Sequence, residues 1–131
     1  MSNEFRGTGN VGDVPALKTV MVGDEERKVV ELRIFFDDYR PDGNGGFEQT
    51  GGFWLDVSVW GERRAAEVAQ HVRKGTRVHV IGRLVESRWT VKETGEERRA
   101  LQLNADDLLL SLARLAEVEY KPRREAGAGG G

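Results

Sequence analysis

Cysteine is absent from this chain of 131 residues, which has only 3 prolines and 2 histidines. Without thiols the protein has no disulfide framework, no thiolate zinc site and no cysteine nucleophile. Long apolar runs are also missing, and residues 1–10 lack the apolar segment of a signal peptide. We therefore expect a cytoplasmic protein with no membrane partner, and the length suits a single small domain.

The charges nearly cancel overall but are unevenly distributed along the chain. Lys and Arg number 20 and Asp and Glu number 22, which gives a formal net charge of −2. Residues 24–62 hold 4 basic and 10 acidic side chains, whereas residues 63–99 hold 10 basic and 5 acidic ones. The total excludes a protein that binds nucleic acid through bulk positive charge, so a polyanion would have to meet a local basic patch.

Two segments alternate apolar and polar residues as half-buried strands do. The first runs from Lys28 to Asp37, and its apolar face is formed by Val30, Leu32, Ile34 and Phe36. The second covers residues 53–60. Between the two, residues 38–46 are rich in Asp, Asn and Gly, and we expect them to form a long, mobile hairpin loop.

The strand at residues 53–60 carries the most informative side chains, because the two-residue period separates them into two faces. One face can fill a core with Phe53, Leu55, Val57 and Val59. The opposite face holds Trp54, Asp56, Ser58 and Trp60. Since the core face is already apolar and exposed tryptophans reduce solubility, we interpret Trp54 and Trp60 as binding residues rather than core residues.

A short amphipathic helix is predicted at residues 62–74, with Gly75 as its left-handed cap. Three extended segments are predicted next, at residues 77–84, 88–91 and 98–103. A hairpin loop at residues 92–97 connects the last two.

The segment from Asn104 to Tyr120 fits two structures. Asp106 and Asp107, followed by three leucines, either begin a helix or finish a strand across a bulge, and the pattern favours the helix. The order of elements predicts a mainly β protein, a five-stranded Greek-key barrel of the oligonucleotide-binding (OB) type with one short helix after its third strand. We assign residues 1–112 to this domain and 113–131 to a short C-terminal segment with a flexible Gly-rich tail.

Four parts of the sequence stand out together: residues 9–12 with Pro15 and Leu17, residues 54–61, residues 72–75 with Val78, Val80 and Gly82, and Arg88-Trp89 with Gly95. In this order and spacing, over about residues 5–112, they resemble bacterial single-stranded DNA-binding proteins. The resemblance implies a non-enzymatic OB barrel that binds single-stranded DNA on stacked aromatic rings. It also implies a homo-oligomer, with a tetramer favoured and a dimer as the alternative.

The resemblance places the stacking aromatics at Trp54, Trp60 and Trp89, with Tyr39 as a fourth on the loop after the second strand. Each base stacked on an aromatic ring is worth about 1–3 kcal/mol without sequence preference. The implied role is sequence-tolerant binding and protection of single strands in replication, recombination, repair or transfer, by a nucleoid-associated protein.

The basic contacts of the family are matched less well. Asp56 and Glu62 stand where the family tends to place Arg or Lys, and in the run before Trp89 only Arg88 is basic. The sequence closes on glycine without the acidic tip through which the family recruits repair and replication enzymes, so we do not expect that recruitment. Such departures are typical of a divergent member, for instance one carried on a plasmid or other mobile element.

Candidates for phosphate and backbone contacts come from the basic second half of the chain. Arg88 is selected because it adjoins Trp89. The other candidates are Arg77 and Arg83, which share a strand face, and Arg73 and Lys74, at the predicted end of the helix.

No catalytic, cofactor or metal site is predicted. His71 and His79 have no partner at metal-ligand spacing, and adjacent acids in a strand point to opposite faces. Two alternatives share the predicted fold. One is a protein-interaction adaptor with weak or no DNA binding, which the acids Asp56 and Glu62 favour; the other is a protein that binds single-stranded RNA.

Overall fold

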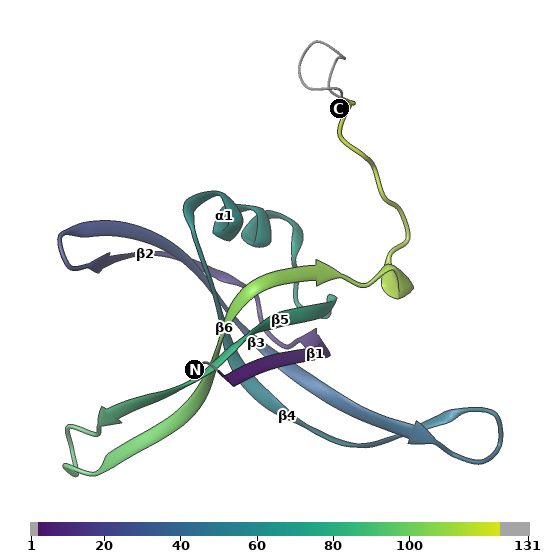
Figure 1. Ribbon diagram of the computed structural model, residues 1–131, viewed down its shortest axis with the longest axis horizontal. Helices are drawn as coiled ribbons and strands as arrows, with labels where there is room; N and C mark the ends of the chain where they lie inside the picture. Colours follow the sequence, from purple (N-terminus) through teal and green to yellow (C-terminus); the bar gives the residue numbers. More distant parts are fainter. Residues whose placement is uncertain (1–2, 124–131) are drawn as a thin grey trace.

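The computed structural model describes residues 3–123 (Figure 1). In order, its elements are β1 (Asn3–Val11), β2 (Ala16–Val22), β3 (Glu25–Pro41), β4 (Phe47–Trp60), α1 (Glu62–His71), β5 (Arg77–Thr90), β6 (Glu97–Leu110) and the 3-10 helix η1 (Leu112–Arg114). The Gly-rich tail predicted at the end of the sequence falls mostly on residues 124–131, which lie outside the described residues.

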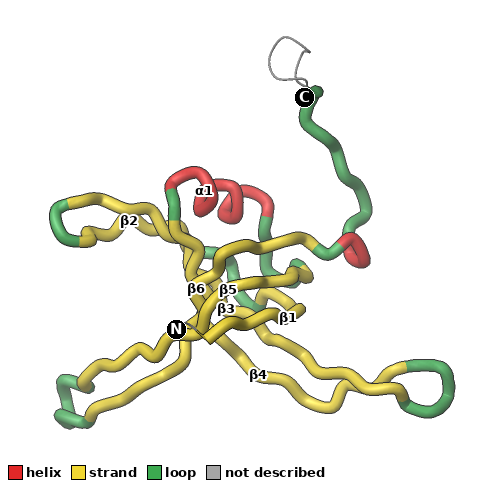
Figure 2. The backbone as a smooth tube through the Cα atoms, viewed as in Figure 1, coloured by secondary structure: helices red, strands yellow, loops and turns green. Residues whose placement is uncertain are grey.

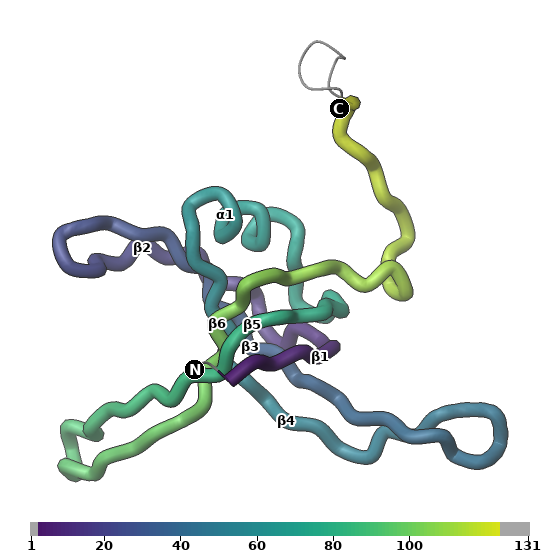
Figure 3. The backbone as a smooth tube through the Cα atoms, viewed as in Figure 1, coloured from purple at the N-terminus to yellow at the C-terminus, as the bar shows by residue number. Residues whose placement is uncertain are grey.

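Five strands close into a ring. β1 pairs antiparallel with β3 on one side and with β5 on the other, and the circle is completed by β5–β6, β6–β4 and β4–β3 pairing. The path of the chain in Figure 3 shows how β1, from the start of the sequence, comes to lie beside β5. The ring confirms the predicted OB-type barrel, with α1 inserted between β4 and β5. β2 lies outside the ring and pairs with the first part of β3.

The core fills the inside of this ring with the faces that alternation predicts. Every apolar residue expected to face inward from β3 is buried, and so are Leu55, Val57 and Val59 of β4. Phe53 is the exception, since its side chain stays exposed while its ring contacts Phe36 at a centroid distance of 5.9 Å. α1 adds Ala65 and Val68 to the core cluster.

Three hairpins extend outward from the barrel, β2–β3, β3–β4 and β5–β6 (Figure 2). The β3–β4 hairpin corrects the long loop expected at residues 38–46, because strand pairing continues to Pro41 and Phe47. A bulge opposite the step from Asp38 to Tyr39 leaves Thr50 out of the ladder, and Gly51 next to it takes a φ of 139° that few other residues tolerate. Tyr39 therefore lies on a strand and not in a loop.

The helix is shorter than predicted. α1 ends at His71 instead of Lys74, because Val72 turns to extended backbone and buries its side chain. Gly75 has a φ of 89°, but it belongs to the turn before β5, where its N–H donates to the carbonyl of Val11. Across residues 3–123, no helix has the length and apolar character needed to span a membrane.

The helix favoured after Asn104 is wrong, and the strand alternative is correct. β6 continues to Leu110 because β5 offers a paired edge along its whole length. Ile81 pairs with Asp107 and Gly82 pairs with Ala105, so Asp106 is the extra residue of a bulge. Residues 115–123 have no helix or strand.

A polar cluster joins the strands that close the barrel. Arg77 on β5 donates to both carboxylate oxygens of Asp37 on β3, from Nη1 at 2.9 Å and from Nη2 at 3.2 Å. Asn10 on β1 accepts from Arg77 and donates to Asp37. The Asp37 side chain is only 2% exposed. Burial raises the pKa of Asp37, but the hydrogen bonds and charge of Arg77 outweigh it and hold the pKa below its ordinary value.

This cluster should make stability depend on pH in the acid range. Because the folded pKa of Asp37 is depressed, its contribution is complete above the unfolded pKa of about 3.9 and is lost as pH falls further. Asp37→Asn should lower the free energy of unfolding by about 1–3 kcal/mol at pH 7, and by less at pH 3. Urea unfolding at both pH values measures this. Glu48→Gln, which breaks the exposed Arg40–Glu48 pair, is the control and should change little. Equal losses at the two pH values would contradict the assignment.

Candidate nucleic-acid interface

The outer face of the β3–β4 ladder carries two of the predicted platforms. Trp54 lies opposite Phe35 and Trp60 lies opposite Val29 in the register of the two strands. The tryptophan side chains are 46% and 37% exposed, respectively, although they belong to a barrel strand. Six residues of a strand rise about 20 Å, so the two rings are separated along the same face of the strand.

Trp54 sits among close neighbours. Its ring lies 5.2 Å from the ring of Phe35, centroid to centroid, at an interplanar angle of 57°. The guanidinium carbon of Arg33 lies over the indole, 5.2 Å from its centroid. A Cβ at Gly12 would come within 2.4 Å of Cζ3 of the indole, so any residue other than glycine at this position would clash with the ring. Trp54 is therefore held in a defined orientation with part of its surface open.

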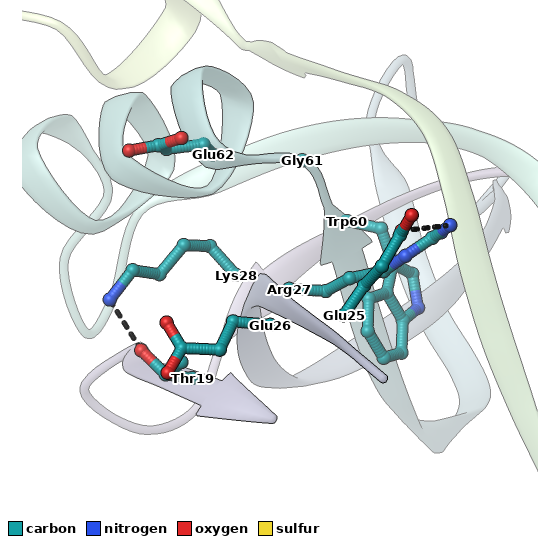
Figure 4. Close-up of a pocket in the computed structure, with 8 residues that line it drawn as sticks. All are labelled: Thr19, Glu25, Glu26, Arg27, Lys28, Trp60, Gly61 and Glu62. Atoms are coloured by element: carbon teal, nitrogen blue, oxygen red, sulfur yellow. Dashed lines mark hydrogen bonds and ion pairs between the residues drawn. The ribbon is translucent and has the colours of Figure 1, made fainter. Parts of the chain in front are cut away.

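Trp60 borders a recess of about 360 Å³ at the start of α1 (Figure 4). Glu25, Glu26 and Glu62 line it together with Arg27 and Lys28, so carboxylates outnumber basic groups. Arg27 pairs with Glu25, and Lys28 donates to the hydroxyl of Thr19. The basic groups nearest to Trp60 are thus already engaged within the chain.

A groove of about 310 Å³ occupies the same face between the two tryptophans. Asp13, Glu31 and Asp56 contribute carboxylates to its lining, and Arg33 contributes its one guanidinium. Asp56 pairs with Arg33 at 3.0 Å, and Glu31 pairs with Lys18 of β2. The groove is therefore polar and largely neutralised by pairs across strands.

Trp89 lies elsewhere, on the β5–β6 hairpin, where it is 47% exposed and stands opposite Arg98. Arg88 is opposite Arg99, and because adjacent residues of a strand point to opposite faces, this pair lies on the other face of the hairpin from Trp89 and Arg98. Arg88 donates to the carboxylate of Glu86 at 2.7 Å and holds the pKa of Glu86 below its ordinary value. The hairpin therefore carries an aromatic ring and several guanidinium groups, of which Arg98 pairs with Glu96 at 3.6 Å and Arg99 with Glu86 at 4.0 Å.

Tyr39, half exposed, is on the β3–β4 hairpin, and its hydroxyl donates to Asp37 at 3.2 Å. The four predicted aromatics are thus exposed but distributed over three parts of the molecule. The barrel face carries Trp54 and Trp60, and one hairpin each carries Tyr39 and Trp89.

The other predicted basic contacts fall in three settings. Arg77 is committed to Asp37 in the polar cluster described above, which leaves its guanidinium engaged inside the fold. Arg83 pairs with Asp106 at 3.6 Å. Arg73 and Lys74 are exposed in the turn after α1, and Arg73 lines a recess with part of the C-terminal segment. None of these four is among the residues that line the groove or the Trp60 recess.

Three neighbours of the tryptophans were missed as site residues by the sequence analysis: Arg33, Arg98 and Arg99. Arg33 was detectable, because the two-residue period of β3 puts it on the outer face with Phe35. Arg98 and Arg99 were not placed beside these residues, because the loop expected at 92–97 sets Arg98 opposite Val91, whereas the observed turn at 91–96 sets Arg98 opposite Trp89 and Arg99 opposite Arg88.

Nothing in the described chain resembles a metal centre. Among residues 3–123 there is no group of three or more His, Cys, Asp and Glu side chains that could hold a metal ion. The ring nitrogen Nδ1 of His79 is 2.9 Å from the hydroxyl of Thr8, which gives that histidine a hydrogen-bond partner in the fold.

Residues 3–111 match the sequence profile of the Single-strand binding protein family. The chain belongs to this family. The match covers the barrel from β1 to the end of β6, and with it the outer face of β3–β4 and the β5–β6 hairpin.

Individual relatives agree with this assignment. A single-stranded DNA-binding protein of Paenarthrobacter aurescens is 41% identical over 83 residues, which is 60% of this chain and 47% of that protein. One from Rhizobium meliloti is 30% identical over 95 residues, 72% of this chain and 52% of that protein. The chain thus spans about half the length of the curated relatives it matches.

Solved structures show the same fold at low identity. A small single-stranded DNA-binding protein from Streptomyces coelicolor superposes with a TM-score of 0.70 at 20% identity, covering 87% of this chain and 98% of that one. A Plasmodium falciparum SSB solved in complex with ssDNA gives a TM-score of 0.66 at 19% identity, with 85% and 96% coverage.

The contact between Gly12 and Trp54 can be tested without any ligand. Gly12→Ala should displace the Trp54 indole, because the added Cβ would overlap Cζ3 at 2.4 Å. In a heteronuclear NMR spectrum the indole N–H signal of Trp54 should shift strongly, while those of Trp60 and Trp89 serve as internal controls. Three unmoved signals would show that the ring is not packed on Gly12.

Proposed function

We propose that this chain binds single-stranded DNA without sequence preference and shields exposed strands in replication, recombination, repair or transfer. The observation that carries the proposal is the outward pair of tryptophans, Trp54 and Trp60, on the β3–β4 face of an OB barrel. This face, together with the loop between the last two barrel strands, is where OB folds bind oligonucleotides. Its relatives from Paenarthrobacter aurescens and Rhizobium meliloti are single-stranded DNA-binding proteins, which supports the same function.

The mechanism is base stacking combined with phosphate contacts. Bases stack on Trp54, Trp60 and Trp89, with Tyr39 as a fourth platform, and stacking is tolerant of sequence because every base has a π face. Arg98 stands opposite Trp89 on the same face of the hairpin, and Arg88 and Arg99, one position along each strand, are the further candidates for backbone contacts. Arg83, Arg73 and Lys74 stay candidates for further contacts along the strand, whereas Arg77 is engaged by Asp37 and is assigned a structural role.

Self-association belongs to the proposal. A tetramer is favoured, with a dimer as the alternative. Apolar side chains that stay exposed on β6 and in η1 support it: Leu101, Leu109, Leu110 and Leu112. Val29 does not add to this surface because it is buried, and Phe35 is partly covered by Trp54. The protein would act with the DNA of the nucleoid, in the cytoplasm.

Removing a platform should weaken binding to a labelled oligothymidine. Trp54→Ala and Trp60→Ala should each raise the Kd about 5- to 150-fold, from a stacking contribution of about 1–3 kcal/mol. Phe47→Ala, which removes an exposed aromatic at the tip of the β3–β4 hairpin, is the matched control and should leave Kd unchanged. Fluorescence anisotropy at low salt measures all three.

The same titration separates the alternatives. An unchanged Kd in the double tryptophan variant would rule out stacking on the barrel face. Equal binding of oligouridine would extend the function to RNA, where stacking operates in the same way. If the unmodified chain binds no single strand at all, the result would support the alternative function, a protein-interaction adaptor. The acidic residues of the groove favour that alternative.

The β5–β6 hairpin should account for part of the salt dependence. Each phosphate contact to a single strand contributes about −0.7 to the slope of log K against log salt. Arg88→Gln and Arg98→Gln should each make the slope shallower by about that amount. Arg63→Gln on α1, which pairs with Glu67, is the control. If the slope is the same in all variants and in the unmodified chain, the hairpin does not contact DNA phosphates.

A further inference from the structure

Arg33, Asp56 and Trp54 form one connected unit on the outer face. Arg33 and Asp56 are directly opposite each other in the β3–β4 register, and Nη1 of Arg33 lies 3.0 Å from Oδ1 of Asp56. From this anchored position the guanidinium lies over the indole of Trp54. The guanidinium is thus attached to a carboxylate and to an aromatic face at the same time.

We propose that Asp56 limits DNA affinity by holding Arg33 as a latch over Trp54. The inference rests on the proposed function and concerns how strongly one platform of that site can bind. A base that stacks on Trp54 needs ring surface that the guanidinium covers in the free protein. DNA therefore has to displace Arg33 before the platform can be used in full.

Opening the latch has two costs. Arg33 loses its ion pair and its contact with the ring, and exposed pairs and cation–π contacts of this kind are weak but measurable. Asp56 is then left as an unpaired carboxylate in a groove that also contains Glu31 and Asp13, next to the phosphates of the incoming strand. The lost ion pair and the unpaired carboxylate both arise from the acid at position 56, so it should lower affinity beyond the effect of its charge alone. The contact between Arg33 and the ring is a separate cost.

The β3–β4 hairpin contains a second ion pair, which serves as a control for the effect of releasing the Trp54 ring. Arg40 and Glu48 are also opposite each other on β3 and β4, 2.9 Å apart, and both pairs are largely exposed. Within residues 3–123, the cation–π contact that the structure records is that of Arg33 on Trp54. Glu48→Gln therefore removes one negative charge and one ion pair without releasing a platform.

The experiment compares Asp56→Asn with Glu48→Gln in oligothymidine titrations. Asp56→Asn should tighten binding roughly 2- to 5-fold, the upper part of the range that corresponds to an exposed ion pair. The released Arg33 can meet a phosphate, so the log–log salt slope should become steeper by about 0.7. Glu48→Gln should change Kd less than twofold.

A double variant tests the link to the ring. In the Trp54→Ala background the gain from Asp56→Asn should be at least twofold smaller, because no platform remains to be released. An equal gain in both backgrounds, or an equal gain from Glu48→Gln, would show that Asp56 acts only through its charge and would overturn the latch. Failure of the unmodified chain to bind single strands at low salt would instead overturn the proposed function.

Discussion

The pairing of β1 with both β3 and β5 is the constraint on which the rest of the structure depends, because it closes the sheet. A closed ring of five strands has a small interior, and aliphatic side chains from alternate positions fill it. The intervening side chains must then face outward, whatever their size. Trp54 and Trp60 are exposed for this reason, and the partly buried Asp37–Arg77 pair joins the strands at the point of closure.

Much of the barrel could be predicted from the sequence, because alternation is a local signal. It identified the buried face of β3, most of that of β4, and the outward tryptophans. The elements that were wrong depend on partners distant in sequence. Residues after Asn104 form a strand because β5 offers them an edge, although their local pattern favours a helix. Tyr39 is on a strand because residues 47–49 extend the ladder beyond the predicted turn.

The candidate site was only partly predictable, because charge counts along a sequence do not show which groups face each other. The basic second half contributes Arg88, Arg98 and Arg99 to one hairpin, but Arg77 serves the fold. Asp56 and Glu62 both stand where the family tends to place basic residues, but their surroundings in the structure differ. Asp56 is paired with Arg33 above Trp54, whereas Glu62 lines the recess beside Trp60. Cross-strand register decides these outcomes, and the charge pattern along the sequence does not reveal it.

The central claim is that bases stack on tryptophans of the outer surface, and the intrinsic fluorescence of those tryptophans tests it most directly. All 3 tryptophans of the chain are in the proposed interface, so emission reports on nothing else. Titration of the unmodified protein with oligothymidine at low salt should quench this emission strongly and saturably, while a duplex of the same length should not. Binding of oligothymidine, detected by anisotropy, that leaves tryptophan emission unchanged would contradict the account.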